Sequence, residues 1–270
     1  MTIRVAVHGA AGRMGRQVIA IVAADPQAEL VAALDRPGSA ALGLNAGVLA
    51  GLGTDCPVTV TSELAPALSA ADVVIDFSLP AGLPELMAAC ERTNTAAVVG
   101  TTGVQEPGRA AIAKLSARAP VVFAPNFSIG VNVFWALARR AAELLGPDAD
   151  LEIVEMHHHH KVDAPSGTAV RLLEEVAAVR GLDPKRAAVH GRHGQVGART
   201  KDEIGVHALR GGDVVGDHTL VLAAPGERIE LSHRAHGREI FARGAVRAAH
   251  WVVGKNPGLY GMDDVLDLAK

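Results

Sequence analysis

The stretch that decides the fold is IRVAVHGAAGRMG, residues 3–15, at the beginning of the sequence. Residues 3–8 predict a buried strand, and the apolar spacing after Gly15 predicts a helix that continues to about residue 24. The loop between them has the pattern G-x-x-G-x-x-G, a variant of the dinucleotide-binding fingerprint. Glycine lets the backbone approach a pyrophosphate closely, and the N–H groups at the start of the helix bind the anion. The residues predicted to bind a dinucleotide here are Gly9, Ala10, Ala11, Gly12, Arg13 and Met14.

The next predicted strand, residues 30–34, is followed by Asp35 and Arg36. Asp35 follows Gly15 at the distance at which dinucleotide-binding folds place an acid for the ribose hydroxyls. An acid favours NAD, whereas an arginine pairs with the additional phosphate of NADP. We therefore expect NADH or NADPH as the cofactor, without a preference between them. A solvated surface arginine explains Arg36 equally well, and a tight turn that binds nothing is the alternative for the glycine loop.

Short apolar runs alternate with helical patterns through the first half of the chain. Further strands are predicted at residues 72–77, 96–100 and 121–124, with helices near 83–92 and 107–118 between them. Continuous apolar strands that alternate with helices are typical of a parallel sheet covered on both faces. The first half therefore predicts an α/β unit with a Rossmann-type parallel sheet. The glycine-rich connection at residues 38–57 fits no element.

The pattern changes after Asn126. A helix is predicted at 131–145, a strand at 151–156, a helix from about Thr168 to Arg180, and strand-like runs at 204–209, 218–223 and 228–234. Consecutive strands without helices between them predict a mixed or antiparallel sheet. The last helical stretch, 242–253, is expected to return to the first unit. We predict a dinucleotide-binding domain of residues 1–127 plus 238–270 and a second α+β domain of residues 128–237.

Two further loops follow predicted strands on the same side of the first sheet. Ligands of open parallel sheets bind outside the carboxyl ends of the strands. In the GTTG loop, Gly100, Thr101 and Thr102 are expected to offer hydroxyls and backbone amides to the nicotinamide end of the cofactor. The APNF loop is expected beside it, with Ala124, Pro125, Asn126 and Phe127.

The segment EMHHHHKVDAPSGT, residues 155–168, is expected to be the active site. Histidine gives or accepts a proton near neutral pH, and the positive charge of Lys161 suits an anionic substrate or a developing negative charge. The PSGT residues precede a predicted helix, where backbone N–H groups bind carboxylates. Capping of the helix by its own side chains is the competing explanation, because both uses need the same donors. The segment thus favours the reduction of a small anion.

The four adjacent histidines, residues 157–160, also suggest a metal. Neighbouring residues on a strand point to opposite faces, however, and zinc sites usually combine separated pairs of ligands. No CxxC pair and no HExxH helix accompanies the run. We therefore predict no metal site.

Composition limits the remaining functions. The 270-residue chain is 49% hydrophobic and 20% charged, with a net charge of −3 and no block of Lys and Arg. This charge argues against nucleic acid as a partner, since such binding relies on neutralising phosphates. No apolar run reaches the roughly 18 residues of a membrane span. Two cysteines without a CxxC pair favour a reducing compartment, so we expect a cytoplasmic enzyme.

Taken together, these segments resemble the 4-hydroxy-tetrahydrodipicolinate reductase family. The resemblance covers essentially the whole chain. It rests on VAVHGAAGRMGR, VVIDFSLPAG, VVGTTG, APNFSIGVN, EMHHHHKVDAPSGTA, RGGDVVGDHTL and GAVRAAHWVVGKNPGLYGMDDVLDL. The His–Lys–PSGT motif is specific to this family, whereas many dehydrogenases share the glycine loop. Met156 and His159 depart from the family's pattern, but neither stands at a position with a known role.

The resemblance implies NAD(P)H-dependent reduction of the cyclic unsaturated imine from 4-hydroxy-tetrahydrodipicolinate to tetrahydrodipicolinate, in the diaminopimelate route to lysine. It implies that His157 and Lys161 are catalytic and supply the proton. His158, Gly167 and Thr168 would bind the small dicarboxylate substrate. The second domain would then serve substrate binding and oligomerisation in a homotetramer. The role of Arg238, the choice between NADH and NADPH and the place of substrate dehydration stay open.

Two rival functions predict different sequences. An aspartate or homoserine dehydrogenase would share the glycine loop but lack the segment at residues 157–168. A nucleotide sensor without activity would have lost Lys161 or the histidine pair at 157 and 158. The chain keeps the loop, the segment and these residues, which favours the reductase.

Overall fold

The computed structural model describes residues 2–268. The chain divides into two compact units: unit 1 consists of Met1–Ile129 and Arg238–Lys270, and unit 2 is Gly130–Gly237. Unit 1 is therefore made from both ends of the chain. No helix within residues 2–268 is both long and apolar enough to cross a membrane.

Unit 1 is built on a seven-stranded sheet in the order β12-β6-β5-β4-β1-β2-β3, in which every neighbouring pair is parallel. The central strands are buried on both faces, as expected for a sheet that helices cover on both sides. The strands are β1 (Ile3–His8), β2 (Ala28–Leu34), β3 (Val60–Thr61), β4 (Val73–Asp76), β5 (Ala96–Val99), β6 (Pro120–Phe123) and β12 (Gly258–Tyr260).

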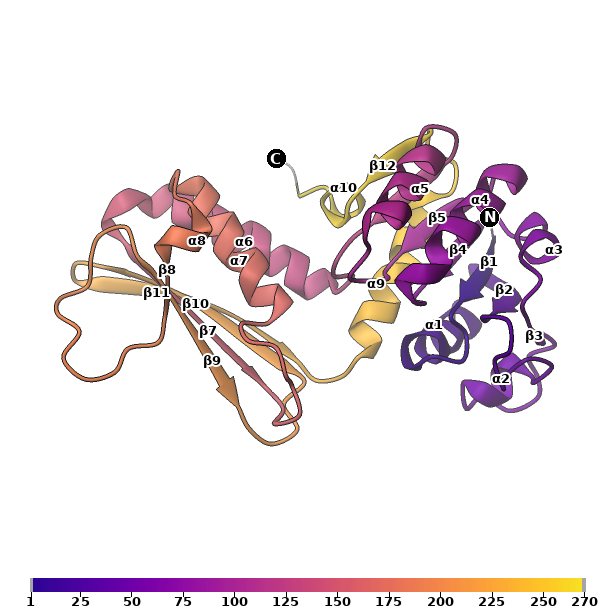
Figure 1. Ribbon diagram of the computed structural model, residues 1–270, viewed down its shortest axis with the longest axis horizontal. Coiled ribbons are helices and arrows are strands. Elements are labelled where there is room, and N and C mark those ends of the chain that lie inside the picture. Colours follow the sequence, from indigo (N-terminus) through magenta and orange to yellow (C-terminus); the bar gives the residue numbers. More distant parts are fainter. Residues whose placement is uncertain (1, 269–270) are drawn as a thin grey trace. The chain divides into compact units, whose positions relative to one another are not determined.

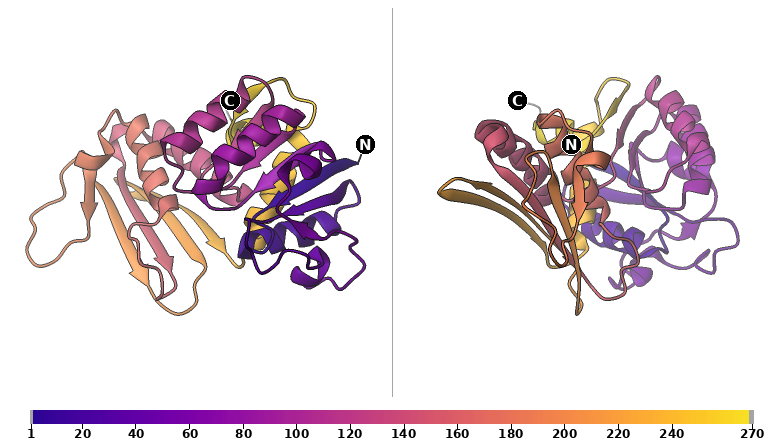
Figure 2. Two further views of the ribbon diagram at one scale, coloured as in Figure 1. Left: turned by 45° about the vertical axis from the view of Figure 1, so that its right-hand side comes forward. Right: turned by 60° about the vertical axis from the view of Figure 1, so that its left-hand side comes forward.

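Helices cover both faces of this sheet (Figures 1 and 2). On one face, α1 (Arg13–Ala23) and α9 (Glu239–Val252) pack on the side chains of Val5, Val7 and Ile75. On the other face, α3 (Leu64–Ser69), α4 (Leu83–Thr93) and α5 (Glu106–Ser116) form a second core. The short elements of this unit are α2 (Ala46–Leu49), η1 (Pro80–Gly82) and α10 (Met262–Leu266).

Parallel pairing brings the carboxyl ends of the strands to one edge of the sheet. His8 lies opposite Asp76 at the ends of β1 and β4, and Asp76 lies opposite Val99 at the end of β5. The loops that leave these strands therefore gather at the edge where open α/β sheets bind ligands.

Unit 2 contains a mixed sheet of five strands in the order β11-β10-β7-β9-β8. The pairs of β10 with β7 and β11 are antiparallel, and β9 is parallel to β7 and β8. The strands are β7 (Asp150–His157), β8 (Ala188–His190), β9 (Ile204–Arg210), β10 (Gly216–Ala224) and β11 (Glu227–Ala235). This architecture confirms the predicted α/β fold with a second, mixed sheet.

One face of the second sheet packs on helices. The helices α6 (Ile129–Leu145) and α7 (Gly167–Val179) lie along this face (Figure 1). Their apolar side chains share a core with Leu151 and Ile153 of β7 and with Leu220 and Leu222 of β10. Side chains alternate along a strand, so Val154, Met156 and Val221 belong to the opposite face. The remaining short elements of unit 2 are η2 (Gly146–Asp148) and α8 (Pro184–Ala187).

Candidate active site

The glycine loop is shaped by close backbone packing. Gly9 has φ +79°, and a Cβ there would lie 2.7 Å from the carbonyl oxygen of Phe77. A Cβ at Gly15 would overlap the carbonyl of Gly9, so its absence lets α1 pack on the loop. Gly12 is the N-cap of α1 and brings no side-chain acceptor to the first N–H groups of the helix. These features fit the pyrophosphate of a dinucleotide, which needs a close backbone and N–H donors.

Asp35 supports the same loop from the end of β2. Its Oδ2 accepts a hydrogen bond from the backbone N–H of Ala11 at 2.8 Å, and its Oδ1 accepts one from the N–H of Arg36 at 2.8 Å. The two residues line a cavity of about 510 Å³ with Gly9 and Gly12. A carboxylate and a guanidinium thus stand beside the loop, where a ribose or its phosphate would need them.

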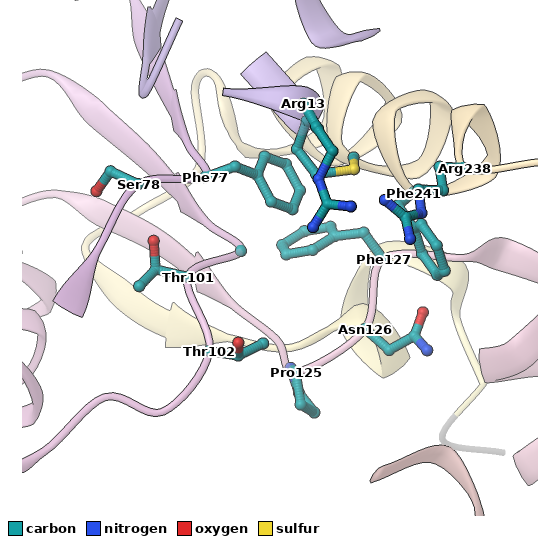
Figure 3. A pocket seen from close by; sticks show the side chains of 12 residues that line it. Arg13, Phe77, Ser78, Thr101, Thr102, Pro125, Asn126, Phe127, Arg238 and Phe241 are labelled. Carbon is teal, nitrogen blue, oxygen red and sulfur yellow. The ribbon is translucent and has the colours of Figure 1, made fainter. Parts of the chain in front are cut away.

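A second cavity of unit 1, also about 510 Å³, lies at the ends of β4, β5 and β6. Figure 3 shows Thr101 and Thr102 on one side of it and Arg238 and Phe241 on the other. The complete lining is Arg13, Met14, Phe77, Ser78, Gly100, Thr101, Thr102, Pro125, Asn126, Phe127, Arg238 and Phe241. The glycine loop, the GTTG loop and the APNF loop therefore meet at one cavity.

Two phenylalanines form the inner wall of this cavity. The rings of Phe77 and Phe127 meet edge to face, with their centroids 5.9 Å apart. A Cβ at Gly100 would overlap the ring of Phe77, and a Cβ at Gly244 of α9 would overlap the carbonyl of Phe127. Both glycines are therefore needed for the aromatic wall. Phe77 ends a strand that the apolar pattern predicts, whereas no sequence pattern marks Phe241 as part of a site.

In unit 2, the candidate site is centred on Glu155, which is fully buried. Arg210 donates to both carboxylate oxygens, at 2.8 and 2.9 Å, and the backbone N–H of Ser166 donates to Oε1 at 3.0 Å. Burial raises the pKa of Glu155, but the hydrogen bonds from Arg210, His157 and Ser166 outweigh it and hold the pKa below its usual range. Glu155 is thus an ionised carboxylate that only accepts hydrogen bonds.

His157 is the last residue of β7 and is 9% exposed. Its Nδ1 lies 2.6 Å from Oε2 of Glu155, and because that carboxylate is ionised, Nδ1 is the donor. A Cβ at Gly216 would lie 3.0 Å from Nε2 of His157, so the glycine leaves space beside this nitrogen. Glu155 thus engages Nδ1, and Nε2 is the ring nitrogen that faces Gly216.

His218 of β10 packs against His157 with ring centroids 5.1 Å apart. Burial, followed by the charge of His157, lowers the pKa of His218 to about 4. At neutral pH it is uncharged, and its Nε2 lies 2.9 Å from the hydroxyl of Ser166. Sequence reasoning gave His218 no role, because nothing local marks a residue that sits on another strand.

Lys161 lies in the loop after β7. Its Nζ donates to both carboxylate oxygens of Asp163 at 2.9 Å, and the side chain is 19% exposed. These hydrogen bonds hold the pKa of Asp163 below its usual range. The charge of Lys161 reaches His218, where burial is the main cause of the lowered pKa and Lys161 lowers it further.

The start of α7 is pinned beside Glu155 by the N–H of Ser166. Ser166 caps the helix by accepting the N–H of Ala169 at 3.2 Å, so the predicted cap exists and uses the third helical residue. A Cβ at Gly167 would meet nothing within 4 Å, so the space above it is open. The indole of Trp135 donates to the carbonyl of Thr168 at 3.2 Å and ties this turn to α6.

The other histidines of the run lie outside the strand. The backbone N–H of His158 donates to the carbonyl of Val214 at 2.7 Å, and its side chain is half-buried. His159 and His160 are exposed, and their rings lie 3.9 Å apart. Within residues 2–268, no three His, Cys, Asp or Glu side chains are grouped as a metal site requires.

Two family models match the chain. The model described as dihydrodipicolinate reductase, N-terminus, matches residues 3–127, and the one described as dihydrodipicolinate reductase, C-terminus, matches residues 130–266. The two matches together cover nearly the whole chain.

Named relatives and solved structures agree with these models. The 4-hydroxy-tetrahydrodipicolinate reductase of Alkalilimnicola ehrlichii is 53% identical over 99% of this chain and 100% of its own length. That of Thiobacillus denitrificans is 52% identical over the same shares. A dipicolinate-bound dihydrodipicolinate reductase from Paenisporosarcina sp. TG-14 has a TM-score of 0.78 and 27% identity, and the match covers 98% of this chain and 99% of that one. The chain therefore belongs to the 4-hydroxy-tetrahydrodipicolinate reductase (dihydrodipicolinate reductase) family.

Proposed function

We propose that His157 and Lys161 handle the proton in the reaction of this enzyme, and that the start of α7 holds the substrate. The enzyme is an NAD(P)H-dependent oxidoreductase of lysine biosynthesis. It reduces the cyclic unsaturated imine from 4-hydroxy-tetrahydrodipicolinate to tetrahydrodipicolinate. When bound, NADH or NADPH supplies the hydride.

The observation that carries the proposal is the hydrogen bond between His157 and Glu155. Hydride addition to a conjugated imine increases electron density on the substrate, and a proton must follow. His157 donates that proton from Nε2, while Nδ1 keeps its hydrogen bond to Glu155. Glu155 stabilises the imidazolium before transfer and fixes the ring orientation, and Arg210 keeps Glu155 ionised throughout.

Lys161 supplies the second positive charge. An ammonium beside the substrate stabilises negative charge that develops during reduction and attracts a dicarboxylate. Asp163 holds Nζ in place at 2.9 Å before substrate binds. We assign Lys161 to charge stabilisation and to the second acid role beside His157.

His158, Gly167 and Thr168 are proposed to grip the substrate. A substrate carboxylate can approach Gly167 closely, because no side chain covers it and the N-terminus of α7 carries the positive end of the helix dipole. His158 follows His157 directly and contributes a second polar group on the same loop.

The cofactor assignment follows the two cavities of unit 1. Gly9 to Met14 are proposed to hold the pyrophosphate, and Asp35 with Arg36 the adenosine ribose. Gly100 to Thr102 and Ala124 to Phe127 are proposed to hold the nicotinamide end. Arg238 lines this second cavity as well, and its guanidinium suits a substrate carboxylate there.

A coupled assay tests the function. The substrate is generated enzymatically in place, and loss of absorbance is followed with NADH and NADPH in parallel. Oxidation of either cofactor that depends on substrate is the expected result. Cofactor binding without such oxidation would favour a nucleotide sensor and overturn the proposed roles. Arg36→Ala in the same assay is expected to raise KM for NADPH more than KM for NADH.

We also propose a homotetramer built through the second sheet. The face of this sheet opposite α6 and α7 carries Val154, Met156 and Val221. The apolar core that unit 2 forms with its helices does not include these three side chains. Apolar side chains on an uncovered sheet face favour contact with another copy of the chain. Sedimentation of the wild type as a tetramer, and of Val221→Glu as smaller species, is the expected outcome. A monomeric wild type would contradict it.

We propose the cytoplasm as the compartment, because it keeps thiols reduced. Both cysteines, Cys56 and Cys90, are free in the structure, which fits a reducing environment. Fractionation of cells, followed by detection of the protein in the cytoplasmic and surface fractions, checks the location.

A further inference from the structure

A buried chain of polar side chains crosses unit 1 beneath its two cavities. His8 ends β1, Asp76 ends β4, and Thr101 follows β5. Nδ1 of His8 lies 2.7 Å from Oδ1 of Asp76, and the hydroxyl of Thr101 donates to Oδ2 at 2.7 Å. The residues are 8%, 0% and 3% exposed. Each carboxylate oxygen of Asp76 thus serves a different neighbour.

Asp76 also holds the backbone of the GTTG loop. Its carbonyl accepts the N–H of Gly100 at 2.8 Å, next to the hydroxyl bond from Thr101. No Lys or Arg in residues 2–268 forms an ion pair with this carboxylate, and the imidazole of His8 is the donor to its Oδ1. A buried carboxylate that loses a donor is strongly penalised and rearranges.

The two ends of this chain open on different cavities. His8 lines the cavity that also contains Gly12, Asp35 and Arg36. Thr101 lines the cavity with Phe77 and Asn126, and Figure 3 shows its side chain at the edge of that cavity. Asp76 lines neither cavity. A single buried carboxylate therefore touches one residue from each half of the proposed dinucleotide site.

The bond from Thr101 to Asp76 also fixes what this hydroxyl offers. Its hydrogen is directed to the carboxylate, so its oxygen can only accept a hydrogen bond from a ligand. An amide N–H₂ is a suitable partner for such an oxygen, whereas a carboxylate would be repelled. The network thus selects for a carboxamide over a carboxylic acid at this end of the ligand.

We propose that Asp76 is a positioning residue that couples the two cavities, so that His8 controls how Thr101 recognises the carboxamide of the nicotinamide ring. The inference rests on the proposed assignment of the cavities to the two ends of the cofactor. Replacing His8 leaves Oδ1 of Asp76 without its donor, and the carboxylate then rearranges and releases Thr101. The effect reaches the nicotinamide end although His8 lines the other cavity.

Binding measurements on the full chain test this coupling. Calorimetry gives the Kd of NAD⁺, of nicotinic acid adenine dinucleotide, which carries a carboxylate in place of the carboxamide, and of ADP-ribose, which lacks the ring. We expect wild type to bind NAD⁺ more tightly than the acid analogue. His8→Leu is expected to reduce this preference by about threefold or more, as for coupled neighbouring residues. A change in the Kd of ADP-ribose would show that the substitution also weakens binding of the adenosine end.

Matched variants decide whether the effect passes through the network. His8→Asn keeps a donor near the position of Nδ1, and Thr101→Ser keeps the hydroxyl, so both should retain the preference for the amide. In a Thr101→Val background, His8→Leu should not reduce the preference for NAD⁺ any further. In a Thr102→Val background, His8→Leu should reduce this preference as much as it does in wild type. Equal preference in wild type and His8→Leu, with ADP-ribose still bound, overturns the coupling alone. Failure of wild type to bind ADP-ribose and NAD⁺ overturns the cofactor assignment and the inference with it.

Discussion

Each unit of the molecule contains one fully buried carboxylate that binds a histidine through Nδ1. In unit 1, Asp76 lies 2.7 Å from His8, and in unit 2, Glu155 lies 2.6 Å from His157. The difference is the second partner. Glu155 is paired with Arg210 through two hydrogen bonds, whereas Asp76 has the neutral hydroxyl of Thr101.

A histidine paired with a buried carboxylate can therefore serve two purposes. Arg210 is always charged, so Glu155 stays ionised whether His157 carries its proton or not. In the proposed mechanism, His157 can therefore give up a proton while Arg210 still balances the charge of Glu155. Asp76 bonds to two side chains at the ends of neighbouring strands, which suits a carboxylate that holds the shape of the loops around it.

The largest expected effect is on turnover. His157→Gln and Lys161→Ala should each lower kcat by about a hundredfold to ten-thousandfold, the range of general acid catalysis. The Kd of NADH should stay within about twofold, since neither residue lines the cavities of unit 1. Steady-state kinetics and calorimetry check both values, and a large loss of cofactor binding would show a structural role instead.

Removing Arg210 should leave Glu155, like Asp76, as a buried carboxylate without an arginine partner. Arg210→Leu leaves Glu155 buried without its cation, and breaking such a pair costs about 3–5 kcal/mol of unfolding free energy. Urea denaturation followed by circular dichroism measures the loss. If Arg210→Leu unfolds with the wild-type midpoint, the ion pair is not what keeps Glu155 ionised.

The neighbouring His218 should make unit 2 sensitive to acid. Its pKa is lowered to about 4 by burial, and then by the charge of His157, so the folded state favours the neutral form. The stabilisation is complete above the unfolded pKa of about 6.5 and disappears as pH falls toward 4, by at most about 3 kcal/mol. His218→Gln should flatten the stability profile between those pH values. A profile parallel to that of wild type would contradict this.

The smallest effect is expected at an ion pair whose lysine is exposed. Lys114 donates to Glu91 at 2.7 Å, but its side chain is 71% exposed. Surface ion pairs contribute about 0–1 kcal/mol, so Lys114→Ala should change the unfolding free energy by less than about 1 kcal/mol. The same denaturation measurement provides the scale against which Arg210→Leu is judged. A comparable loss at both sites would mean that burial does not distinguish the two pairs.

Much of the fold could be predicted because apolar runs and glycines act locally. The strand Ile3–His8, the glycine loop and the mixed second sheet follow from periodicity and turn residues, and the family, the fold class, the reductase activity and the NAD(P)H cofactor are confirmed. Residues 38–57 have no apolar periodicity that predicts a helix or strand, and the helix α2 within them has only four residues (Ala46–Leu49). The edge strand β12 is similarly short, and its place beside β6 depends on pairing with a distant segment.

In the candidate site too, residues that lie in one sequence segment could be predicted, whereas those that depend on distant partners could not. His157, Lys161 and the PSGT turn stand in one recognisable segment, and their roles remain predictions. Glu155 begins that segment, but its importance depends on Arg210 of a different strand, which periodicity cannot place beside it. Asp76 was predicted only as part of a strand, since its function follows from the register of β1, β4 and β5.

The discontinuity of unit 1 has a consequence for synthesis on the ribosome. The core of its first face needs α9, which lies after the whole of unit 2 in the chain. At the usual speed of translation, about ten seconds separate the emergence of β6 from that of α9. During this interval α1 and the sheet expose an apolar surface to the cell. The nascent chain should therefore depend on chaperone protection until residues beyond 238 emerge, and the dinucleotide cannot stabilise a finished unit before then.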